Sequence, residues 1–316
     1  MKIKLRTMGV ASVALLISLP AMAQVVPGFI VEDYAYVADP VNLTIAPDGV
    51  MYTGRDNTGS GGTTGDAVKI HRIGVGGAPV VEYGVAPLSD PDAVLFDAYG
   101  WIADTPGSVL VAGAVHGGLP IISHVSGIRP DETIQDIFAT TTIVNPNYLM
   151  FDGTGRLLII GDLGDVWQTT GAEPTHLFDM PVPSFATLNA NDDVYSAGND
   201  GVIRIYDSFG TLIDDSFVTG LGEGFTNLAF GPGGGVWGTY LYGLKRATGE
   251  LIRIDDLGNV TVIGTGFDTT TYDMQFGPDG ALYATVFGQD KVIRIIPEPA
   301  TLTLMLIGGL LLHRRR

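Results

Sequence analysis

The chain has 316 residues, and its 34 acidic residues against 17 Lys and Arg give a formal net charge of −17 at pH 7. An apolar content of 46% is enough for a sizeable core, which excludes disorder as the main state. The absence of cysteine excludes a disulfide scaffold, a thiolate zinc site and a cysteine nucleophile, and the acidic balance argues against binding to nucleic acid.

The first 23 residues have the pattern of a secretory signal peptide. A basic start is followed by an apolar stretch over residues 9–19, and Ala21-Met22-Ala23 gives the small-x-small pattern before Gln24. An apolar run of this length is too short to span a bilayer as an anchor. We therefore expect export, with cleavage by signal peptidase between Ala23 and Gln24.

Residues 24–296 contain six copies of one unit, in which an apolar strand, a tight turn rich in Gly, Pro and Asp, and a second apolar strand follow one another. The first copy is the segment 43–52 and the last is the segment 274–283, with turns at Pro47-Asp48-Gly49 and Pro278-Asp279-Gly280. Repeats spaced by about 37–58 residues are typical of four-stranded propeller blades. The sequence predicts an all-β, six-bladed propeller.

The last repeat provides only three strands before the chain turns into its C-terminal tail. The segment Phe29–Tyr36 has strand composition and precedes the first repeat. We predict that it forms the outer strand of the last blade, because this closes the ring and removes an open sheet edge.

Polar residues begin the innermost strands, where propeller blades face the central channel. They are Asn42, Asp92, Asn147, Asn227 and Asp273, with Ser184 in the fourth blade. Such oxygen ligands suit Ca²⁺ or Mg²⁺, so the channel is a candidate cation or sugar site. The alternative is structural, because Asn and Asp often begin strands by capping the local turn.

The repeat pattern resembles the propeller superfamily that contains NHL-repeat proteins, regucalcin-type gluconolactonases and soluble quinoprotein sugar dehydrogenases. The lactonase resemblance implies a divalent metal held by a glutamate in a Gly-Glu-Gly setting, two asparagines and an aspartate. Gly222-Glu223-Gly224 matches that setting and adds Glu223 to the candidate metal ligands. It precedes the fifth repeat, however, whereas the glutamate of the family precedes the first.

The C-terminal tail, residues 297–316, combines three features in a fixed order. Pro297-Glu298-Pro299 interrupts the last strand, residues 300–312 are almost wholly apolar, and Arg314-Arg315-Arg316 follow His313. As a helix, the apolar run would cover roughly 20 Å, less than the ~30 Å hydrocarbon core of a bilayer. Its length therefore favours a temporary membrane hold over a permanent anchor.

This tail closely resembles the PEP-CTERM sorting signal of bacteria. The resemblance implies that an exosortase recognises the tail of an inner-membrane-anchored precursor, cleaves it near the triplet and releases the protein to the cell envelope or extracellular matrix. A simple C-terminal membrane tail is the alternative interpretation.

Three functions fit the sequence. The first is a non-catalytic, exported propeller that binds a polysaccharide, a surface protein or a cation. The second is a lactonase-type hydrolase that depends on a divalent metal held by the candidate ligands. The third, a quinoprotein-type dehydrogenase, fits least well, because a quinone cofactor needs a basic cluster and the chain between its ends has 11 bases against 33 acids.

Overall fold

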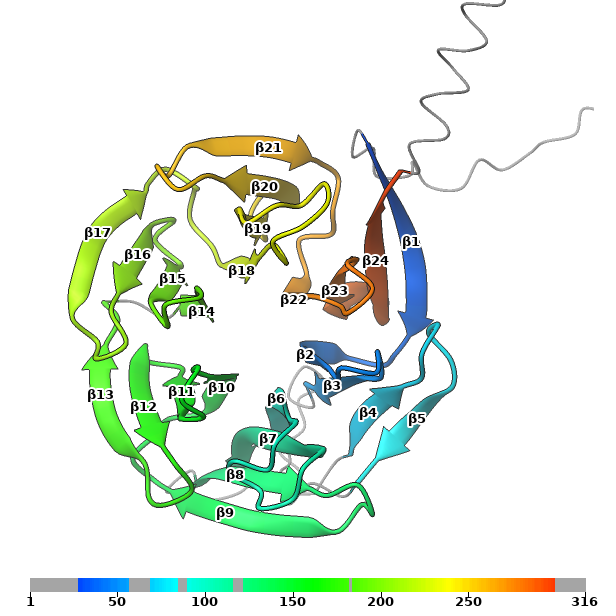
Figure 1. The fold of residues 1–316 in the computed structure, drawn as a ribbon, viewed down its shortest axis with the longest axis vertical. Helices are drawn as coiled ribbons and strands as arrows, with labels where there is room; N and C mark the ends of the chain where they lie inside the picture. The colour runs from blue at the N-terminus through cyan, green and yellow to red at the C-terminus, as the bar shows by residue number, and fades with distance from the viewer. Residues whose placement is uncertain (1–27, 57–68, 85–89, 116–121, 182–183, 299–316) are drawn as a thin grey trace, which may run out of the picture.

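The computed structural model describes residues 28–56, 69–84, 90–115, 122–181 and 184–298. Within these ranges, 24 strands form six four-stranded antiparallel sheets, which surround one central axis as blades (Figure 1). The prediction of an all-β, six-bladed propeller is confirmed.

In each blade the strands follow one another from the axis outward. Blade 1 holds β2 (Pro40–Ile45), β3 (Met51–Arg55), β4 (Ile70–Ile73) and β5 (Val80–Tyr83). Blade 2 holds β6 (Asp90–Asp97), β7 (Ser108–Val115), β8 (Ile122–Ile128) and β9 (Ile134–Thr140). Blade 3 holds β10 (Pro146–Phe151), β11 (Leu157–Gly161), β12 (Asp165–Thr169) and β13 (Thr175–Asp179).

The other three blades repeat this plan. Blade 4 holds β14 (Ser184–Leu188), β15 (Val194–Gly198), β16 (Ile203–Tyr206) and β17 (Leu212–Val218). Blade 5 holds β18 (Thr226–Phe230), β19 (Leu241–Lys245), β20 (Glu250–Ile254) and β21 (Val260–Gly264). Blade 6 holds β22 (Thr271–Phe276), β23 (Leu282–Val286), β24 (Lys291–Pro297) and β1 (Phe29–Tyr36), with the single 3₁₀ turn η1 (Phe287–Gln289) of the described ranges before β24.

The two ends of the propeller meet in blade 6, as the sequence predicts. Strand β1 pairs with β24 from Phe29 opposite Pro297 to Tyr36 opposite Lys291. Two ion pairs reinforce the pairing of β1 with β24. The distance is 2.7 Å between Lys291 Nζ and Asp33 Oδ1, and 2.8 Å between an Arg294 nitrogen and a Glu32 oxygen. The ring is thus closed by hydrogen bonding along a whole strand.

The tight turns have the predicted chemistry. In the first blade, Gly49 has a φ of 87°, and the Asp48 carboxylate accepts a hydrogen bond from the Val50 amide at 3.0 Å. In the sixth, Gly280 has a φ of 75°, and the Asp279 carboxylate accepts one from the Ala281 amide at 3.1 Å. Positive φ at the glycine turns the strand back on itself at low steric cost.

The core is divided among the seams between neighbouring blades. Each of the six seams in the described part of the chain has its own cluster of buried apolar side chains. The seam between blades 5 and 6, for example, buries Trp237, Tyr242, Leu251 and Leu282. Since most strands bury both faces, the repeats are apolar almost throughout.

The predicted signal peptide and most of the predicted sorting tail, including Ala23, Gln24, Pro299 and Arg314–Arg316, lie outside the described residues. Strand β24 includes Pro297, so the strand runs one residue beyond the boundary expected from the sequence. Glu298 follows, and its amide donates to the Gly28 carbonyl at 2.9 Å. No helix in the described ranges is long and apolar enough to cross a membrane.

Candidate functional site

The predicted channel residues lie at or near the start of the innermost strands, and the structure gives them two different roles. Asn42, Asn227 and Asp273, in blades 1, 5 and 6, are almost fully buried and bind the main chain of neighbouring blades. Asp92 and Asn147, in blades 2 and 3, join a cluster of polar side chains.

Asn42 connects three blades through one amide group. Its Nδ2 donates to the Asp92 carbonyl at 2.9 Å and to the Asn147 carbonyl at 2.7 Å. In the same way, Asn227 Nδ2 donates to the Thr271 carbonyl of the next blade at 3.3 Å. These bonds satisfy buried main-chain acceptors, which supports the structural interpretation for both asparagines.

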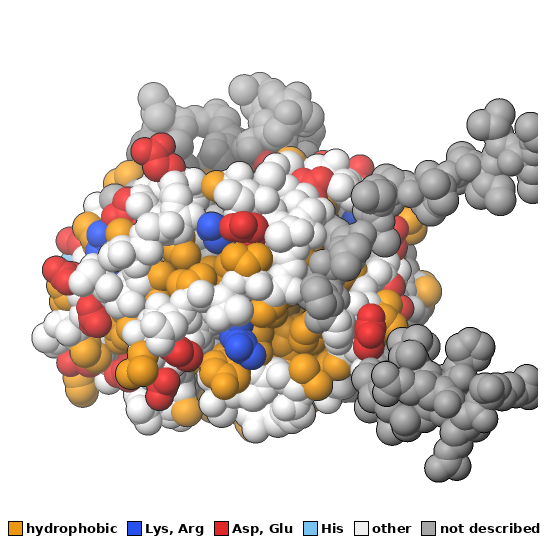
Figure 2. Space-filling view, turned by 90° about the horizontal axis from the view of Figure 1, so that it is seen from above, with side chains coloured by type: hydrophobic (Ala, Val, Ile, Leu, Met, Phe, Trp, Pro, Cys, Tyr) orange, Lys and Arg blue, Asp and Glu red, His pale blue; other side chains and the backbone are white. Residues whose placement is uncertain are grey.

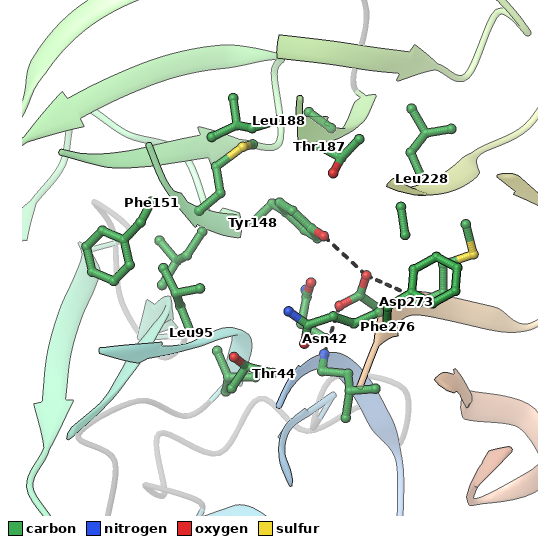
Figure 3. Close-up of a pocket in the computed structure, with 18 of the residues that line it drawn as sticks. Asn42, Thr44, Leu95, Tyr148, Phe151, Thr187, Leu188, Leu228, Asp273 and Phe276 are labelled. Carbon is green, nitrogen blue, oxygen red and sulfur yellow. Dashed lines mark hydrogen bonds between the residues drawn. The ribbon is translucent and has the colours of Figure 1, made fainter. Parts of the chain in front are cut away.

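Asp273 closes the ring between blades 6 and 1. Its carboxylate accepts hydrogen bonds from the Leu43 amide at 2.9 Å, from the Met274 amide at 2.8 Å and from the Tyr148 hydroxyl at 3.3 Å. Figure 3 shows Tyr148 and Asp273 pointing toward one another across the channel. Only 3% of Asp273 is exposed, and this burial raises its pKa from 3.8 to about 7.

Tyr148 separates two cavities. One, of about 400 Å³, is bounded by the innermost strands of all six blades and includes Asn42, Tyr148, Asp273 and the apolar side chains around them in Figure 3. The other, of about 180 Å³, lies on the other side of Tyr148 and also includes Asn147. It is below the usual size of sites for drug-sized ligands, so it suits a small molecule.

The smaller cavity, which we call the mouth pocket, combines aromatic walls with convergent polar groups. Four blades contribute to it, from blade 3 to blade 6. Its lining residues are Asn147, Tyr148, Gly161, Asp162, Phe185, Phe225, Arg246 and Tyr272.

Phe185 is the centre of the aromatic wall. It packs edge to face against Tyr148, Phe225 and Tyr272, with ring centroids 6.0, 5.4 and 5.7 Å apart. Edge-to-face packing of this kind fixes the rings relative to one another. The wall of the pocket is therefore preorganised.

Arg246 places a cation against this wall. Its guanidinium lies 5.2 Å from the Tyr272 ring centroid and 5.8 Å from that of Phe225, within cation–π distance. Partial burial lowers its pKa. Within the described residues, no carboxylate lies at ion-pair distance from this guanidinium, so its hydrogen-bond donors can reach a ligand.

An oxygen-rich cluster adjoins the pocket between blades 2 and 3. The Asn145 amide nitrogen lies 3.1 Å from Asp92 Oδ2, 3.2 Å from Asn147 Oδ1 and 3.2 Å from Asp162 Oδ2. Asn147 Nδ2 also donates to Asp162. An amide has two hydrogens for these three acceptors, so the cluster has a surplus of oxygen atoms.

Electrostatics in this cluster disfavour ionised carboxylates. Burial first, and then the nearby Asp90, raise the pKa of Asp92 well above its ordinary value. Burial likewise raises the pKa of Asp162. Perturbed carboxyls beside a pocket are a common property of functional sites.

The cluster contains two of the predicted cation ligands, Asp92 and Asn147. Asn145 Oδ1 is buried without a hydrogen-bond partner among the described residues, and Asn145 has a φ of 41°, which asparagine tolerates better than most residues. Its neighbours Asp92, Asn147 and Asp162 supply the hard oxygens that Ca²⁺ prefers. However, nowhere in the described ranges do three or more His, Asp or Glu side chains gather in a way that could hold a metal ion.

The remaining predicted ligands lie elsewhere. Glu223 is exposed in the loop between β17 and β18, and it lines neither cavity. That loop packs on blade 4, where the Gly224 amide donates to the Asn199 carbonyl at 2.8 Å. Ser184 begins β14, as expected from the repeat.

Sequence reasoning missed Asn145, Asp162 and Arg246 as site residues, together with the aromatic wall. A signal for the wall does exist in the sequence. Each of the four aromatic residues lies within two positions of the polar residue that the sequence places at the start of an innermost strand. Asp162 and Arg246, by contrast, follow second strands of different blades, and only the closed ring brings them together.

Comparisons with known proteins agree with the fold. No protein-family model and no curated protein matches the chain. A protein named as an oxidoreductase (glucose dehydrogenase) from Thermus thermophilus is similar in structure, with a TM-score of 0.61 and 16% identity over 85% of this chain and 100% of its own.

Two further solved structures represent other activities. A gluconolactonase from Xanthomonas campestris has a TM-score of 0.61 and 10% identity over 87% of this chain and 91% of its own. An auxiliary nutrient binding protein from Bacteroides thetaiotaomicron has a TM-score of 0.60 and 12% identity over 84% of this chain and 70% of its own. Since proteins named as a glucose dehydrogenase, a gluconolactonase and a nutrient binding protein share this propeller fold, these likenesses establish the fold alone.

Proposed function

We propose that this protein is an exported propeller that binds a small, hydroxyl-rich, uncharged ligand, such as one sugar unit of a polysaccharide, in the mouth pocket. The observation that carries the proposal is the combination in one small cavity of rigid aromatic rings with Asn147, Asp162 and Arg246. Aromatic faces pack against the apolar face of a sugar ring, while amide, carboxyl and guanidinium groups exchange hydrogen bonds with its hydroxyls.

Charge favours an uncharged ligand. Asp162 is the single acidic residue and Arg246 the single basic residue among the described residues that line the pocket. The described lining therefore has no excess of either charge that would attract an ionic ligand. A neutral ligand with hydroxyl donors pairs with the surplus oxygens instead.

The direct test is calorimetric titration of the chain with neutral and acidic mono- and oligosaccharides. We expect binding of a neutral sugar, weakened about tenfold in Arg246→Met by the loss of roughly one hydrogen bond's worth of free energy. Arg253→Met is the matched control, because Arg253 lies in the same blade, 4.6 Å from the Tyr240 ring centroid, and does not line the pocket. Absence of sugar binding, or equal losses in both variants, would reject the proposal.

The second candidate is a lactonase-type hydrolase with Ca²⁺ or Mg²⁺ at the oxygen-rich cluster. The three oxygen acceptors around the Asn145 amide favour it, because a cation could bind these hard oxygens and would stabilise the ionised form of the two carboxyls. About one equivalent of bound metal, a melting temperature that falls on chelation, and loss of both effects in Asp162→Asn would support it. Lactone hydrolysis by the metal-loaded chain would then decide between enzyme and binding protein.

Export and sorting are part of the proposal. This part of the proposal is supported by the signal-peptide pattern of residues 1–23 and by the order of features from Pro297 to Arg316. In this proposal the precursor is held in the inner membrane and then released to the envelope or matrix by an exosortase. Deletion of residues 299–316 should change where the protein accumulates, and unchanged localisation would contradict the sorting function.

A further inference from the structure

A third hollow, larger than the two cavities described above, lies on the rim of the disc at the seam between blades 5 and 6. Its volume is about 520 Å³. Figure 2 looks onto this edge of the disc and shows apolar side chains gathered in a hollow near its centre. We call it the rim groove; its lining residues are Phe29, Val236, Tyr242, Arg253, Val262, Ile263, Gly264 and Thr265.

The rim groove exposes apolar side chains over a rigid aromatic base. Val236 is 61% exposed and Val262 is 49% exposed. Beneath them, the Phe29 ring packs at a tilt against the buried Trp237, with 4.5 Å between ring centroids, and Trp237 packs on Tyr242 at 5.0 Å. Apolar surface that surrounds a hollow in this way is typical of an interaction site.

The chain leaves the propeller beside this groove. Phe29, one wall of the groove, pairs with Pro297, and the Glu298 amide is hydrogen-bonded to the Gly28 carbonyl. The apolar segment 300–312 begins two residues later, and each residue of extended chain spans up to ~3.5 Å. A segment tethered so closely has an effective concentration in the millimolar range at the groove.

We propose that part of the apolar segment 300–312 of the same chain docks in the rim groove while the precursor is in water. The segment needs cover because its residues are almost all apolar, and the groove is an apolar hollow lined by Phe29, the residue that pairs with Pro297. A second copy of the chain is a poorer occupant, because two molecules with a net charge of −17 repel one another. The groove would thus shield the membrane segment until lipid takes its place.

The test uses the absence of cysteine from the chain. In residues 24–316, free of detergent and at low concentration, V262C combined with L306C should form an intramolecular disulfide under mild oxidation. The control pair is I30C with L306C. Ile30 follows Phe29 on strand β1 and is 37% exposed, but it does not line the groove. We expect the disulfide of the V262C pair to form about tenfold faster than that of the control pair. This factor corresponds to a free-energy preference of roughly 1.4 kcal/mol for the docked segment.

Three outcomes would overturn the proposal: equal rates for the two pairs, no disulfide with position 306, or disulfides only between chains. A second measurement does not depend on oxidation. Val262→Asp should release the segment and raise binding of the full chain to phosphatidylcholine vesicles about tenfold, whereas Thr261→Asp, at an exposed neighbouring position on β21, should not. Unchanged vesicle binding in Val262→Asp would also overturn it.

Discussion

Residues at equivalent places in the repeats have different tasks in the two halves of the ring. In blades 5, 6 and 1, Asn227, Asp273 and Asn42 bind the main chain of neighbouring blades and hold the ring together. In blades 2 and 3, Asp92 and Asn147 contribute side-chain oxygens to a crowded cluster beside the mouth pocket. The comparison shows that position in a repeat places a side chain near the channel, while its neighbours decide whether it serves stability or binding.

The largest effect should come from Asp273 and depend on pH. Because its pKa is about 7 in the folded chain and about 3.8 when unfolded, its contribution to stability is complete below pH 4 and is lost as pH rises through 7. The upper limit is about 4 kcal/mol in the free energy of unfolding. Denaturant titrations from pH 5 to pH 8 should therefore show less loss of stability in Asp273→Asn than in the unaltered chain. Parallel pH curves would contradict this.

The next effect should come from Asn42. Asn42→Ala leaves the carbonyls of Asp92 and Asn147 without their donor, which should cost about 2–4 kcal/mol of unfolding free energy. The control is Asn259→Ala, which removes an exposed bond from Asn259 to Asp255 and should cost less than about 0.5 kcal/mol. Equal losses in the two variants would show that Asn42 does not hold the blades together.

The smallest effect should have the opposite sign. Asp92→Asn removes a carboxyl that burial and Asp90 make costly to ionise, so it should stabilise the chain by about 1 kcal/mol at pH 8 and by less at pH 5. Thermal melts at the two pH values measure this difference. Destabilisation at pH 8 would instead place Asp92 among the residues that hold the ring, and the contrast between the two halves would fail.

Much of the architecture can be predicted from the sequence because it rests on local chemistry. Turns such as Pro47-Asp48-Gly49 recur between apolar strands, and β1 is predictable as the closing strand because the last repeat provides only three strands. The strand-start residues are predictable for the same reason, since each is fixed by its place in a repeat. Export through the signal peptide and sorting through the C-terminal tail stay predictions.

The composition of the site is less predictable. Asn147 and Asp162 lie close together within one blade, but Phe185, Arg246 and Tyr272 reach the same pocket from three other blades. The sequence repeats alone determine that polar side chains face the channel, because each blade forms by pairing between strands that are close in the sequence. Only the closed ring decided which of them meet, because contacts between residues a hundred positions apart depend on how all six blades pack around the axis.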